Sequence, residues 1–484
     1  MLFVKKIIPS EKIILVIILF IALTLRIYKL SSKSLWLDEG LALWIANRDS
    51  IPSLFKELSY NLHPPVYYLI LHYWLKIFGA SEIALRSISV ISGVASVFMT
   101  YKIGKIIYNK HVGLISSFLS AISIFLINYS QEGKSCSFTC FLTTVSTYFF
   151  IKYLQTNKFK NLAWYTTTGS ILILTHSSGL FIVLSHFIYI LISRAGKFKD
   201  LTVDIKKVLL AQGIITGIAT IWSLTIKDQI PIRKGYIIGW IREPSVQTLI
   251  DTFKDYYSGS TFTFVIFLLF LLIALFNKEK SKTTLVFTLG ILPPILLFMV
   301  SKFWQPLYLH RYTIGASISF YILVAKGILM TKPTTRILGI LFIILSSFEL
   351  LYNYHLSSYP YIYKAIDWKK AVSVVEKNAT NKDLIVFDAW YIKRFLFDYY
   401  SKREDLIKTN FGYNIAKPDY KKIAEELKTQ LKRYKRVWLI NYHMDDKEMY
   451  IEKSIRKNYK LTNDWKFNEK YSYDKLEIKL YESE

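Results

Sequence analysis

The 484-residue sequence has two cysteines, no P-loop and no glycine-rich nucleotide fingerprint in a strand–helix context. The missing nucleotide motifs argue against direct use of ATP and against a soluble nucleotide-sugar fold. Cys136 and Cys140 are four residues apart, so a helix places them on one face, and no other metal-ligand residues accompany them. We therefore expect the two thiols to pack inside a helix bundle and not to bind zinc.

Acidic residues are scarce, with 35 Asp and Glu against 62 Lys and Arg, which gives a formal net charge of +27. In a soluble chain such an excess would indicate nucleic acid as a partner. Much of the positive charge instead lies in short loops between apolar blocks, as is typical of cytoplasmic loops beside an anionic bilayer. We therefore expect a lipid bilayer as a partner and no nucleic acid.

Long apolar runs dominate the composition, which is 52% hydrophobic with a mean hydropathy of +0.29. The runs approach the length of roughly 20 residues that crosses a bilayer as a helix. No small-x-small cleavage site follows the first run, residues 13–30, so we expect a retained anchor and not a signal peptide. The sequence predicts a mostly α-helical, polytopic transmembrane helix bundle.

The distribution of basic loops predicts a topology with the N-terminus in the cytoplasm. Lys5, Lys6 and Lys12 precede the first span, and the next basic loop must lie on the same side. Only one further span can then lie between the first span and that basic loop. The short aromatic stretch 66–78 is therefore not counted as a span and is expected to be a helix in the outer interface. About eleven spans result: 13–30, 83–101, 112–129, 136–153, 162–175, 180–193, 208–224, 262–276, 285–300, 312–330 and 337–351.

The composition changes beyond about residue 355, where long apolar blocks give way to Lys, Asp, Glu and Asn. Strand-like runs at 383–387, 436–440 and 476–481, with a helical pattern over 420–434, predict a small soluble α/β domain. We expect a transmembrane domain over residues 1–355 and a soluble domain over residues 356–484. The odd number of spans places this C-terminal domain outside the cytoplasm.

Two adjacent carboxylates, Asp38 and Glu39, follow the first span directly. One interpretation is structural, because Asp and Glu are favoured at the start of a helix and residues 40–47 can form one. The other is catalytic: a carboxylate near the bilayer has a raised pKa and makes a better base for a hydroxyl nucleophile. Adjacent residues on a helix point in different directions, so we expect the two to have different roles.

Other polar groups fall on the predicted outer side, and each has a simpler interpretation. His63 precedes two prolines, which can merely set a turn and a helix start. Glu132 and Lys134 form a polar turn that is either a solvated loop or part of a cavity shared with Asp38. His63 alone does not decide between a phosphate, a sugar hydroxyl and a metal.

Several basic residues also lie on the side that the charge rule disfavours. Long loops are partly exempt from that rule, so the loop 226–261 can carry them without a function. The alternative is a site for an anionic ligand such as a lipid phosphate, which arginine binds well with its two-pronged guanidinium. The residues concerned are Lys227, Arg233, Lys234 and Arg242 in that loop, and Arg311 with its neighbours His310 and Tyr312.

Together these motifs resemble the polytopic membrane glycosyltransferases of the C-type fold, and more narrowly glycosyltransferase family 39, the protein-mannosyltransferase and aminoarabinose-transferase group. The resemblance is strongest over residues 30–135 and weak beyond 355, and it departs at 133–135, where many relatives have a small residue followed by Arg. The motifs that carry it are Leu35-Trp36-Leu37-Asp38-Glu39, His63-Pro64-Pro65-Val66-Tyr67-Tyr68, Phe78-Gly79-Ala80-Ser81-Glu82, Leu85-Arg86, Tyr129-Ser130-Gln131-Glu132, Thr175-His176 and Arg311-Tyr312.

The resemblance implies a transferase of the cell membrane that uses a polyprenyl-phosphate-linked sugar donor and a lipid, glycan or protein acceptor. Asp38 and Glu39 take the position of the family's external acid pair. No cofactor is certain, and a divalent metal is left open, with Glu39 and His63 as its candidate ligands. The donor phosphate is assigned to Lys134, Arg242, Arg311, Arg233 and Lys234, and the substrate cavity to His63, Tyr67, Glu132, His176, His310 and Tyr312.

The sequence therefore predicts an inverting hexosyl- or pentosyltransferase with Asp38 as general base. One carboxylate suffices, because a phosphate leaves without a general acid, unlike the leaving group in glycoside hydrolysis. A transporter or flippase of lipid-linked sugars is the alternative, and it predicts charges buried within spans and broken helices. A receptor role with a degenerate membrane domain is a third, disfavoured by the intact acid pair.

Overall fold

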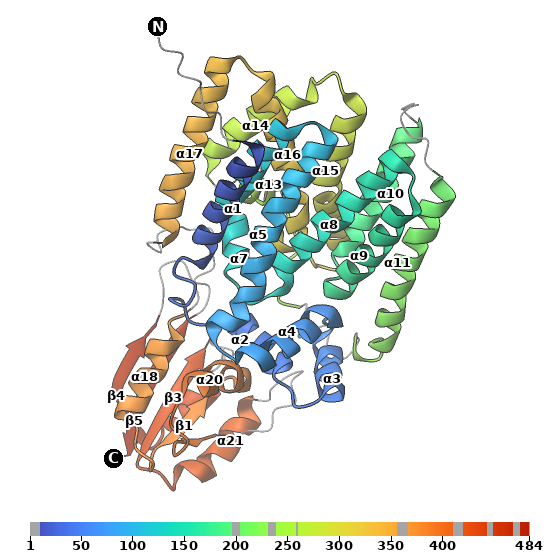
Figure 1. The fold of residues 1–484 in the computed structure, drawn as a ribbon. Coiled ribbons are helices and arrows are strands. Elements are labelled where there is room, and N and C mark those ends of the chain that lie inside the picture. Colours follow the sequence, from blue (N-terminus) through green and yellow to red (C-terminus); the bar gives the residue numbers. More distant parts are fainter. Residues whose placement is uncertain are drawn as a thin grey trace. The chain divides into compact units, whose positions relative to one another are not determined.

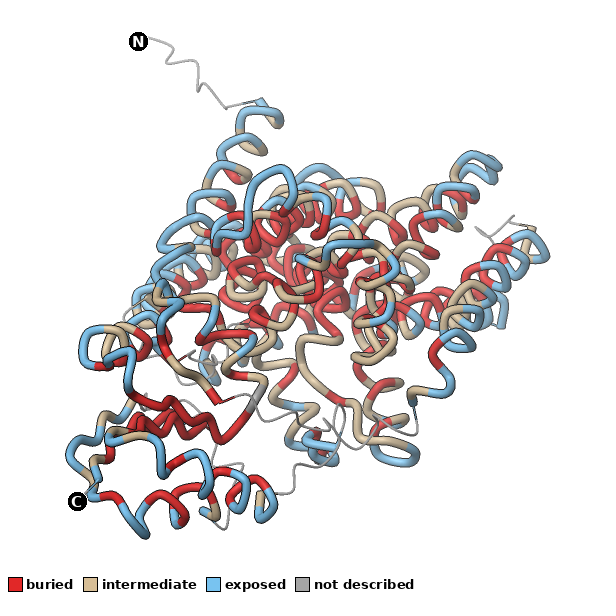
Figure 2. The backbone as a smooth tube through the Cα atoms, turned by 90° about the horizontal axis from the view of Figure 1, so that it is seen from below, coloured by how far each residue is buried: buried red, intermediate tan, exposed pale blue. Residues whose placement is uncertain are grey.

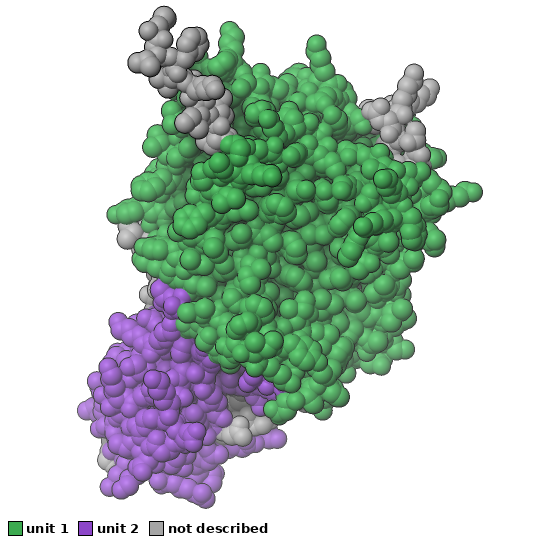
Figure 3. Space-filling view, in the orientation of Figure 1, with its two compact units in different colours: residues 1–30, 49–361 green, residues 31–48, 362–484 purple. Residues whose placement is uncertain are grey.

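The computed structural model describes residues 10–195, 204–230, 239–257, 260–355, 366–409, 420–442, 449–467 and 475–483. Its contacts divide the chain into two compact units (Figure 3). The first contains residues 1–30 and 49–361, and the second contains residues 31–48 and 362–484. The segment that carries the acid pair therefore groups with the C-terminal residues and not with the helices that flank it in the sequence.

The first unit is a helix bundle (Figure 1). The helix α5 packs along both α6 and α8, and α8 packs along α9. Its helices are α1 (Glu11–Ile27), α3 (Ile51–Asn61), α4 (Pro65–Phe78), α5 (Glu82–Ile107), α6 (Lys110–Ile122), α7 (Ile124–Ser130), α8 (Ser135–Thr156), α9 (Phe159–Thr175), α10 (Gly179–Ala195), α11 (Ile205–Thr225), α13 (Val246–Tyr256), α14 (Thr261–Leu275), α15 (Lys280–Phe303), η1 (His310–Ala316), α16 (Ser317–Met330) and α17 (Pro333–His355).

Five helical stretches among the described residues are long and apolar enough to cross a membrane, and seven if two bent helix pairs each count as one span. The prediction of a multi-pass helical bundle is confirmed, whereas the number of eleven spans stays a prediction. The five stretches are Glu82–Ile107, Ile205–Thr225, Lys280–Phe303, His310–Met330 and Pro333–His355. The stretch 66–78, expected to be an interfacial helix, forms the helix α4, and residues 176–178, between the expected spans 162–175 and 180–193, separate α9 from α10.

Two segments of the bundle have more structure than the sequence predicted. The expected single span 112–129 is broken into α6 and α7, which meet at an angle of 61°. The break occurs because the side chain of Ser123 accepts a hydrogen bond from the amide of Leu126 and caps a new helix. The expected loop 226–261 contains the amphipathic helix α13, which Ser245 and Thr248 cap.

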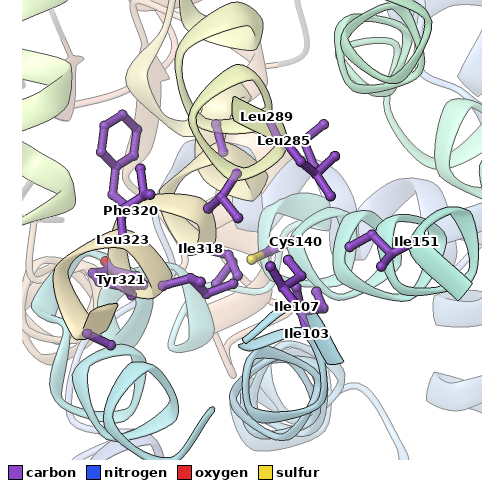
Figure 4. Close-up of a cluster of buried hydrophobic side chains, with 14 of the residues drawn as sticks. Ile103, Ile107, Cys140, Ile151, Leu285, Leu289, Ile318, Phe320, Tyr321 and Leu323 are labelled. Carbon is purple, nitrogen blue, oxygen red and sulfur yellow. The ribbon is translucent and has the colours of Figure 1, made fainter. Parts of the chain in front are cut away.

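The core of the bundle lies around α8 and α16. Buried side chains from α5, α8, α15 and α16 meet there, among them Ile103, Cys140, Leu289 and Tyr321 (Figure 4). Cys136 and Cys140 are both buried, in keeping with the expected packing role. The apolar stretch His310–Met330 is 78% buried, whereas Pro333–His355 is only 11% buried. Exposed residues lie along the outside of the bundle (Figure 2), and large apolar side chains such as Leu345 and Phe348 of α17 are among them. Such an apolar exterior is what a lipid environment requires.

The second unit contains a five-stranded mixed sheet in the order β2-β1-β3-β5-β4. The strand β1 pairs parallel to β2 and β3, and β5 pairs antiparallel to β3 and β4. The strands predicted at 383–387, 436–440 and 476–481 are thereby confirmed. The elements are α2 (Leu37–Ala46), α18 (Trp368–Asn378), β1 (Leu384–Phe387), α19 (Trp390–Ile392), η2 (Lys393–Phe397), α20 (Asp398–Tyr400), β2 (Ile407–Lys408), α21 (Tyr420–Leu431), β3 (Arg436–Tyr442), α22 (Tyr450–Ile455), β4 (Tyr459–Lys466) and β5 (Leu476–Ser483).

Alternation along the strands lets helices pack against the sheet. Val386 and Leu439 pack in one cluster with Leu427 of α21 and Ile455 of α22. The neighbouring strand residue Phe387, which points to the opposite face, contacts Phe397 of η2. The predicted helix 420–434 is confirmed as α21, and the sheet is a rigid support for the elements that pack on it.

Candidate active site

The acid pair opens the short helix α2 within the second unit. Asp38 is half-buried in the first turn, where the partial positive charge of a helix N-terminus favours an ionised carboxylate. Glu39 is fully buried, and its Oε2 accepts a hydrogen bond of 3.4 Å from the backbone N–H of Trp36, the residue that precedes the helix. The two carboxylates therefore lie in different surroundings, and Glu39 helps to cap the helix that carries Asp38.

Contacts with the C-terminal residues hold the segment 31–48 in place. The hydroxyl of Ser34 donates a hydrogen bond to Oδ1 of Asp367 at 3.2 Å and accepts one from the backbone N–H of Lys369 at 3.1 Å. The backbone N–H of Leu35 donates to the hydroxyl of Tyr400 at 2.7 Å. Since these partners lie more than 300 residues later in the sequence, the position of α2 depends on the folded C-terminal part of the second unit.

The helix α2 also approaches η2 closely. A Cβ atom at Gly40 would lie 2.4 Å from the carbonyl oxygen of Phe395, so only glycine fits there. One turn later, the rings of Trp44 and Phe395 are 5.4 Å apart. The guanidinium of Arg48 lies 3.7 Å from the centre of the Trp44 ring and that of Arg394 lies 5.2 Å from it. Packing on both sides of Gly40 thus fixes the orientation of the acid pair.

Lys134 and Arg311 both lie within electrostatic reach of His176 in the first unit. Burial, followed by the positive charges of Arg311 and Lys134, lowers the pKa of His176 to about 4. The sequence places these three residues in separate loops, at the start of α8, in the turn before α10 and in η1. The fold brings two cationic side chains to a neutral imidazole, a combination that suits an anionic ligand.

The tautomer of His176 follows from its hydrogen bonds. Its Nδ1 accepts from the backbone N–H of Ser178 at 3.2 Å and lies 2.9 Å from the Ser178 hydroxyl. A nitrogen that accepts from an N–H carries no proton, so the ring proton of the neutral imidazole is on Nε2. The ring lies 4.6 Å from that of Tyr312, which limits its rotation. His176 therefore presents a fixed, uncharged N–H donor.

Two acidic residues, Glu132 and Asp255, lie near Arg311. Tyr129, at the end of α7, is in electrostatic reach of Glu132, Arg311 and Asp255. The side-chain amide of Asn128 donates to Oε1 of Glu132 at 3.0 Å. The mixed charges indicate a polar site that can contact both the phosphate and the hydroxyl groups of a ligand.

A pair that the sequence did not predict joins α13 to η1. Oδ2 of Asp255 forms a short hydrogen bond to Nδ1 of His310. The hydroxyl of Tyr256 donates to the carbonyl and the hydroxyl of Thr313, at 2.9 and 2.6 Å. These contacts fix η1, and with it Arg311 and Tyr312. Nothing in the local sequence around Asp255 indicates a partner 55 residues away, although the apolar spacing of α13 would have revealed the helix.

The remaining candidates differ in their surroundings. His63 stacks on Tyr68 at 5.3 Å just before Pro65 begins α4, so the double proline does form a helix start. Tyr67 is fully buried, and the centre of its ring lies 6.4 Å from that of Phe138 in α8. Arg242 is exposed to solvent. Arg233 and Lys234 lie outside the described residues. Among the described parts of the chain, no group of three or more His, Cys, Asp or Glu could hold a metal ion.

A small cavity of about 20 Å³, with room for little more than one water molecule, lies in the bundle. It follows η1 and α16 from Gly315 to Ile322, so it starts four residues after Arg311 in the same helical stretch. Isoleucine side chains form much of its wall, and Thr143, Thr144, Thr147 and Ser319 are its polar residues. This cavity is far smaller than a ligand pocket, which typically measures about 300–1,000 Å³.

Comparison with known proteins places this geometry in a wider context. Residues 62–222 match the family described as dolichyl-phosphate-mannose-protein mannosyltransferase. No curated protein sequence matches the chain significantly. The structure of ArnT from Cupriavidus metallidurans bound to undecaprenyl phosphate is similar with a TM-score of 0.62 at 10% identity, over 97% of this chain and 98% of that one. The chain has the C-type membrane glycosyltransferase fold.

Other proteins share this C-type fold. The Archaeoglobus fulgidus oligosaccharyltransferase AglB, in complex with an inhibitory peptide and a dolichol-phosphate, has a TM-score of 0.53 at 12% identity, over 93% of this chain and 72% of that one. The mycobacterial arabinofuranosyltransferase AftD has a TM-score of 0.55 at 10% identity, over 98% of this chain and 40% of that one. The family match contains His63, Glu132, Lys134 and His176, whereas Asp38 and Arg311 lie outside it.

Proposed function

We propose that this protein transfers a sugar from a polyprenyl-phosphate-linked donor to a hydroxyl acceptor on the extracytoplasmic side of a cell membrane. The observation that carries the proposal is the grouping of Lys134 and Arg311 around the neutral His176 in a chain with the C-type fold. In this proposal residues 1–355 span the membrane from a cytoplasmic N-terminus, and residues 356–484 lie outside.

The reaction we propose is a single displacement. Asp38 takes the proton of the acceptor hydroxyl, whose oxygen forms a bond to the anomeric carbon of the sugar. The bond between that carbon and the phosphate oxygen breaks, and polyprenyl phosphate leaves with the electron pair, which inverts the anomeric centre. Lys134 and Arg311 neutralise the charge that develops on the phosphate, and Nε2–H of His176 donates a hydrogen bond to it.

Two further features support these roles. Glu39, which caps α2, is suited to orient Asp38 and not to act as a second base. Among proteins of this fold, ArnT has been solved with undecaprenyl phosphate and AglB with a dolichol-phosphate and a peptide.

Transport of a lipid-linked sugar is the second candidate, because two of its expected features are present. The span formed by α6 and α7 is broken, and Arg26 of α1 is fully buried. However, the guanidinium of Arg26 donates to four oxygen atoms of the protein itself, so it serves the fold and not a ligand. We therefore favour transfer over transport.

The test uses purified protein in detergent with a panel of undecaprenyl-phosphate-linked sugars, and measures the release of undecaprenyl phosphate in the presence of acceptor hydroxyls. We expect release by the wild type and none above background by Asp38→Asn. The matched control is Asp49→Asn, which changes an exposed carboxylate eleven residues later and should keep the wild-type rate. Full activity of Asp38→Asn would refute the assigned base, and absence of release with every donor would refute the transfer.

A further inference from the structure

Arg26 is a fully buried guanidinium near the end of the apolar helix α1. Its Nε donates to the hydroxyl of Ser130 at 3.2 Å. Nη1 donates to the carbonyls of Ala22 and Ala121 at 3.1 and 2.9 Å, and Nη2 donates to that of Ser120 at 3.2 Å. A buried charge in an apolar bundle is costly, and here neutral oxygens on three different helices solvate it.

Two of these carbonyls are available because the span α6–α7 is broken. The last turn of a helix leaves carbonyl groups without an intrahelical donor. Ser120 and Ala121 belong to that last turn of α6, directly before the break at Ser123. Arg26 thus caps α6 from a neighbouring helix and, through Ser130, also holds the end of α7.

Gln131 makes the reciprocal contact. This residue follows α7, and its side-chain Nε2 donates to the carbonyls of Arg26 and Tyr28 at 3.1 and 2.9 Å. These carbonyls belong to the C-terminal end of α1, which is itself short of donors. The Oε1 atom of Gln131 accepts a hydrogen bond of 2.8 Å from the hydroxyl of Tyr354 in α17. Arg26 therefore caps the broken span, and Gln131 caps α1 in return.

The turn that follows Gln131 carries Glu132 and Lys134 and is held on its other side by α5. The hydroxyl of Ser89 in α5 donates to the carbonyl of Lys134 at 3.1 Å, and that of Ser137 in α8 donates to the carbonyl of Ser89 at 2.8 Å. Gly93 of α5 permits the close approach, because a Cβ there would lie 2.2 Å from Oγ of Ser130 and 2.9 Å from Nε of Arg26.

We propose that Arg26 and Gln131 form a reciprocal helix cap, together the α1–α7 latch, whose function is to position the turn 131–134 and so the cationic end of Lys134. Arg26 and Gln131 are positioning residues, since neither is assigned a contact with the substrate. The planar fork of the guanidinium reaches Ser130, Ala121 and Ser120 at once, which an ammonium group on a flexible stem does not reproduce. The charge alone is then insufficient for the latch.

The test compares full-length variants by hydrogen–deuterium exchange and by kinetics. Arg26→Gln and Arg26→Lys should both speed amide exchange over residues 131–137 at least about tenfold, with exchange in β3 unchanged, because only local opening becomes easier. Gln131→Glu keeps the acceptor for Tyr354 and removes the donor to α1, so it should have the same local effect. It also carries the test if the Arg26 variants do not fold.

Matched controls separate the latch from a general loss of stability. Arg336→Gln removes a guanidinium that caps the C-terminal end of α16, through Leu329 and Thr331, away from the turn. Gly93→Ala should loosen the turn, whereas Gly213→Ala in α11, where a Cβ meets nothing within 4 Å, should not. The two controls, Arg336→Gln and Gly213→Ala, should leave exchange over residues 131–137 within about twofold of the wild type, because distant sites act independently.

The kinetic part rests on the proposed function and uses undecaprenyl-phosphate-linked donors. Arg26→Lys should raise the KM for the donor about tenfold, because a misplaced cation binds the phosphate less well, while the KM for the acceptor stays unchanged. If Arg26→Lys and Gln131→Glu match Arg336→Gln in exchange over residues 131–137, the latch is refuted. If the wild type transfers no sugar, the proposed function fails, and the exchange comparison still decides the latch.

Discussion

Replacing Gly40 by alanine tests the link between the acid pair and the C-terminal part of the second unit. The new Cβ would lie 2.4 Å from the carbonyl oxygen of Phe395 and 3.0 Å from its carbonyl carbon. Ordinary van der Waals contact begins at 3.4 Å, so α2 and η2 must separate by about 1 Å. Both obstructing atoms belong to the backbone, which cannot rotate away as a flexible side chain would.

The size of the effect follows from this displacement. Overpacking of a well-packed contact costs typically about 1–3 kcal/mol of folding free energy. Asp38 lies two residues before Gly40 on the same short helix, so it moves together with the backbone. Misplacement of a catalytic group by about 1 Å lowers a rate by roughly 100-fold. We therefore expect the Gly40→Ala variant to remain folded, with a stability lower by about 1–3 kcal/mol, and to react roughly 100-fold more slowly than the wild type.

The assay combines thermal unfolding of the purified protein with release of undecaprenyl phosphate from a sugar-linked donor. The control is Gly217→Ala in α11, where a Cβ meets nothing within 4 Å and alanine favours the helix by up to about 1 kcal/mol. This control should keep both activity and stability. A folded Gly40→Ala variant with a rate within about threefold of the wild type would show that the position of α2 does not govern the reaction.

Three further predictions concern charge. Lys134→Gln should weaken equilibrium binding of undecaprenyl phosphate about tenfold and flatten its dependence on salt, since one cation is lost; unchanged binding would exclude Lys134 from the phosphate site. His176 has a lowered pKa, so the unfolded chain binds a proton first as the pH falls from about 6.5 towards 4. The unfolding temperature should therefore drop over this range in the wild type, and drop less in His176→Asn; parallel curves would contradict the buried imidazole. Glu452 accepts from Lys479, Arg456 and Tyr481 at 3.0, 2.8 and 2.7 Å, and Glu477 also pairs with Lys479 at 2.9 Å. Glu452→Gln should therefore destabilise the second unit by about 1–3 kcal/mol. Asp405→Asn, which breaks only the exposed pair with Arg403, should change the denaturation midpoint of the second unit much less than Glu452→Gln does.

Local patterns predicted the elements that local forces determine. Alternation and apolar runs located the three strands, and the short aromatic stretch before Gly79 gave α4. Hydropathy failed at Ser123, because a single serine barely changes the mean of an apolar window although its hydroxyl caps a new helix. The amphipathic spacing of Val246, Leu249 and Phe253 was present in the sequence and indicates α13.

The candidate site depends on contacts that no local pattern contains. The sequence identified Lys134, His176 and Arg311 separately, but only the fold shows that both cations act on the imidazole. Pairing of Asp255 with His310 and of Ser34 with Asp367 spans 55 and 333 positions, so neither partner leaves a trace in its neighbours. The acid pair was found because charge beside an apolar run is unusual, whereas its attachment to the C-terminal residues was not predicted.

The membership of residues 31–48 in the second unit has a consequence for biosynthesis. A ribosome makes this segment early, but its partners at Asp367, Phe395 and Tyr400 come more than 300 residues later. During translation α2 is therefore without the surface that shapes it, and Asp38 acquires its final setting only after residues 367–400 have been made. If Asp38 is the base that we propose, a polypeptide that ends before these partners would hold the helices of the bundle and lack activity.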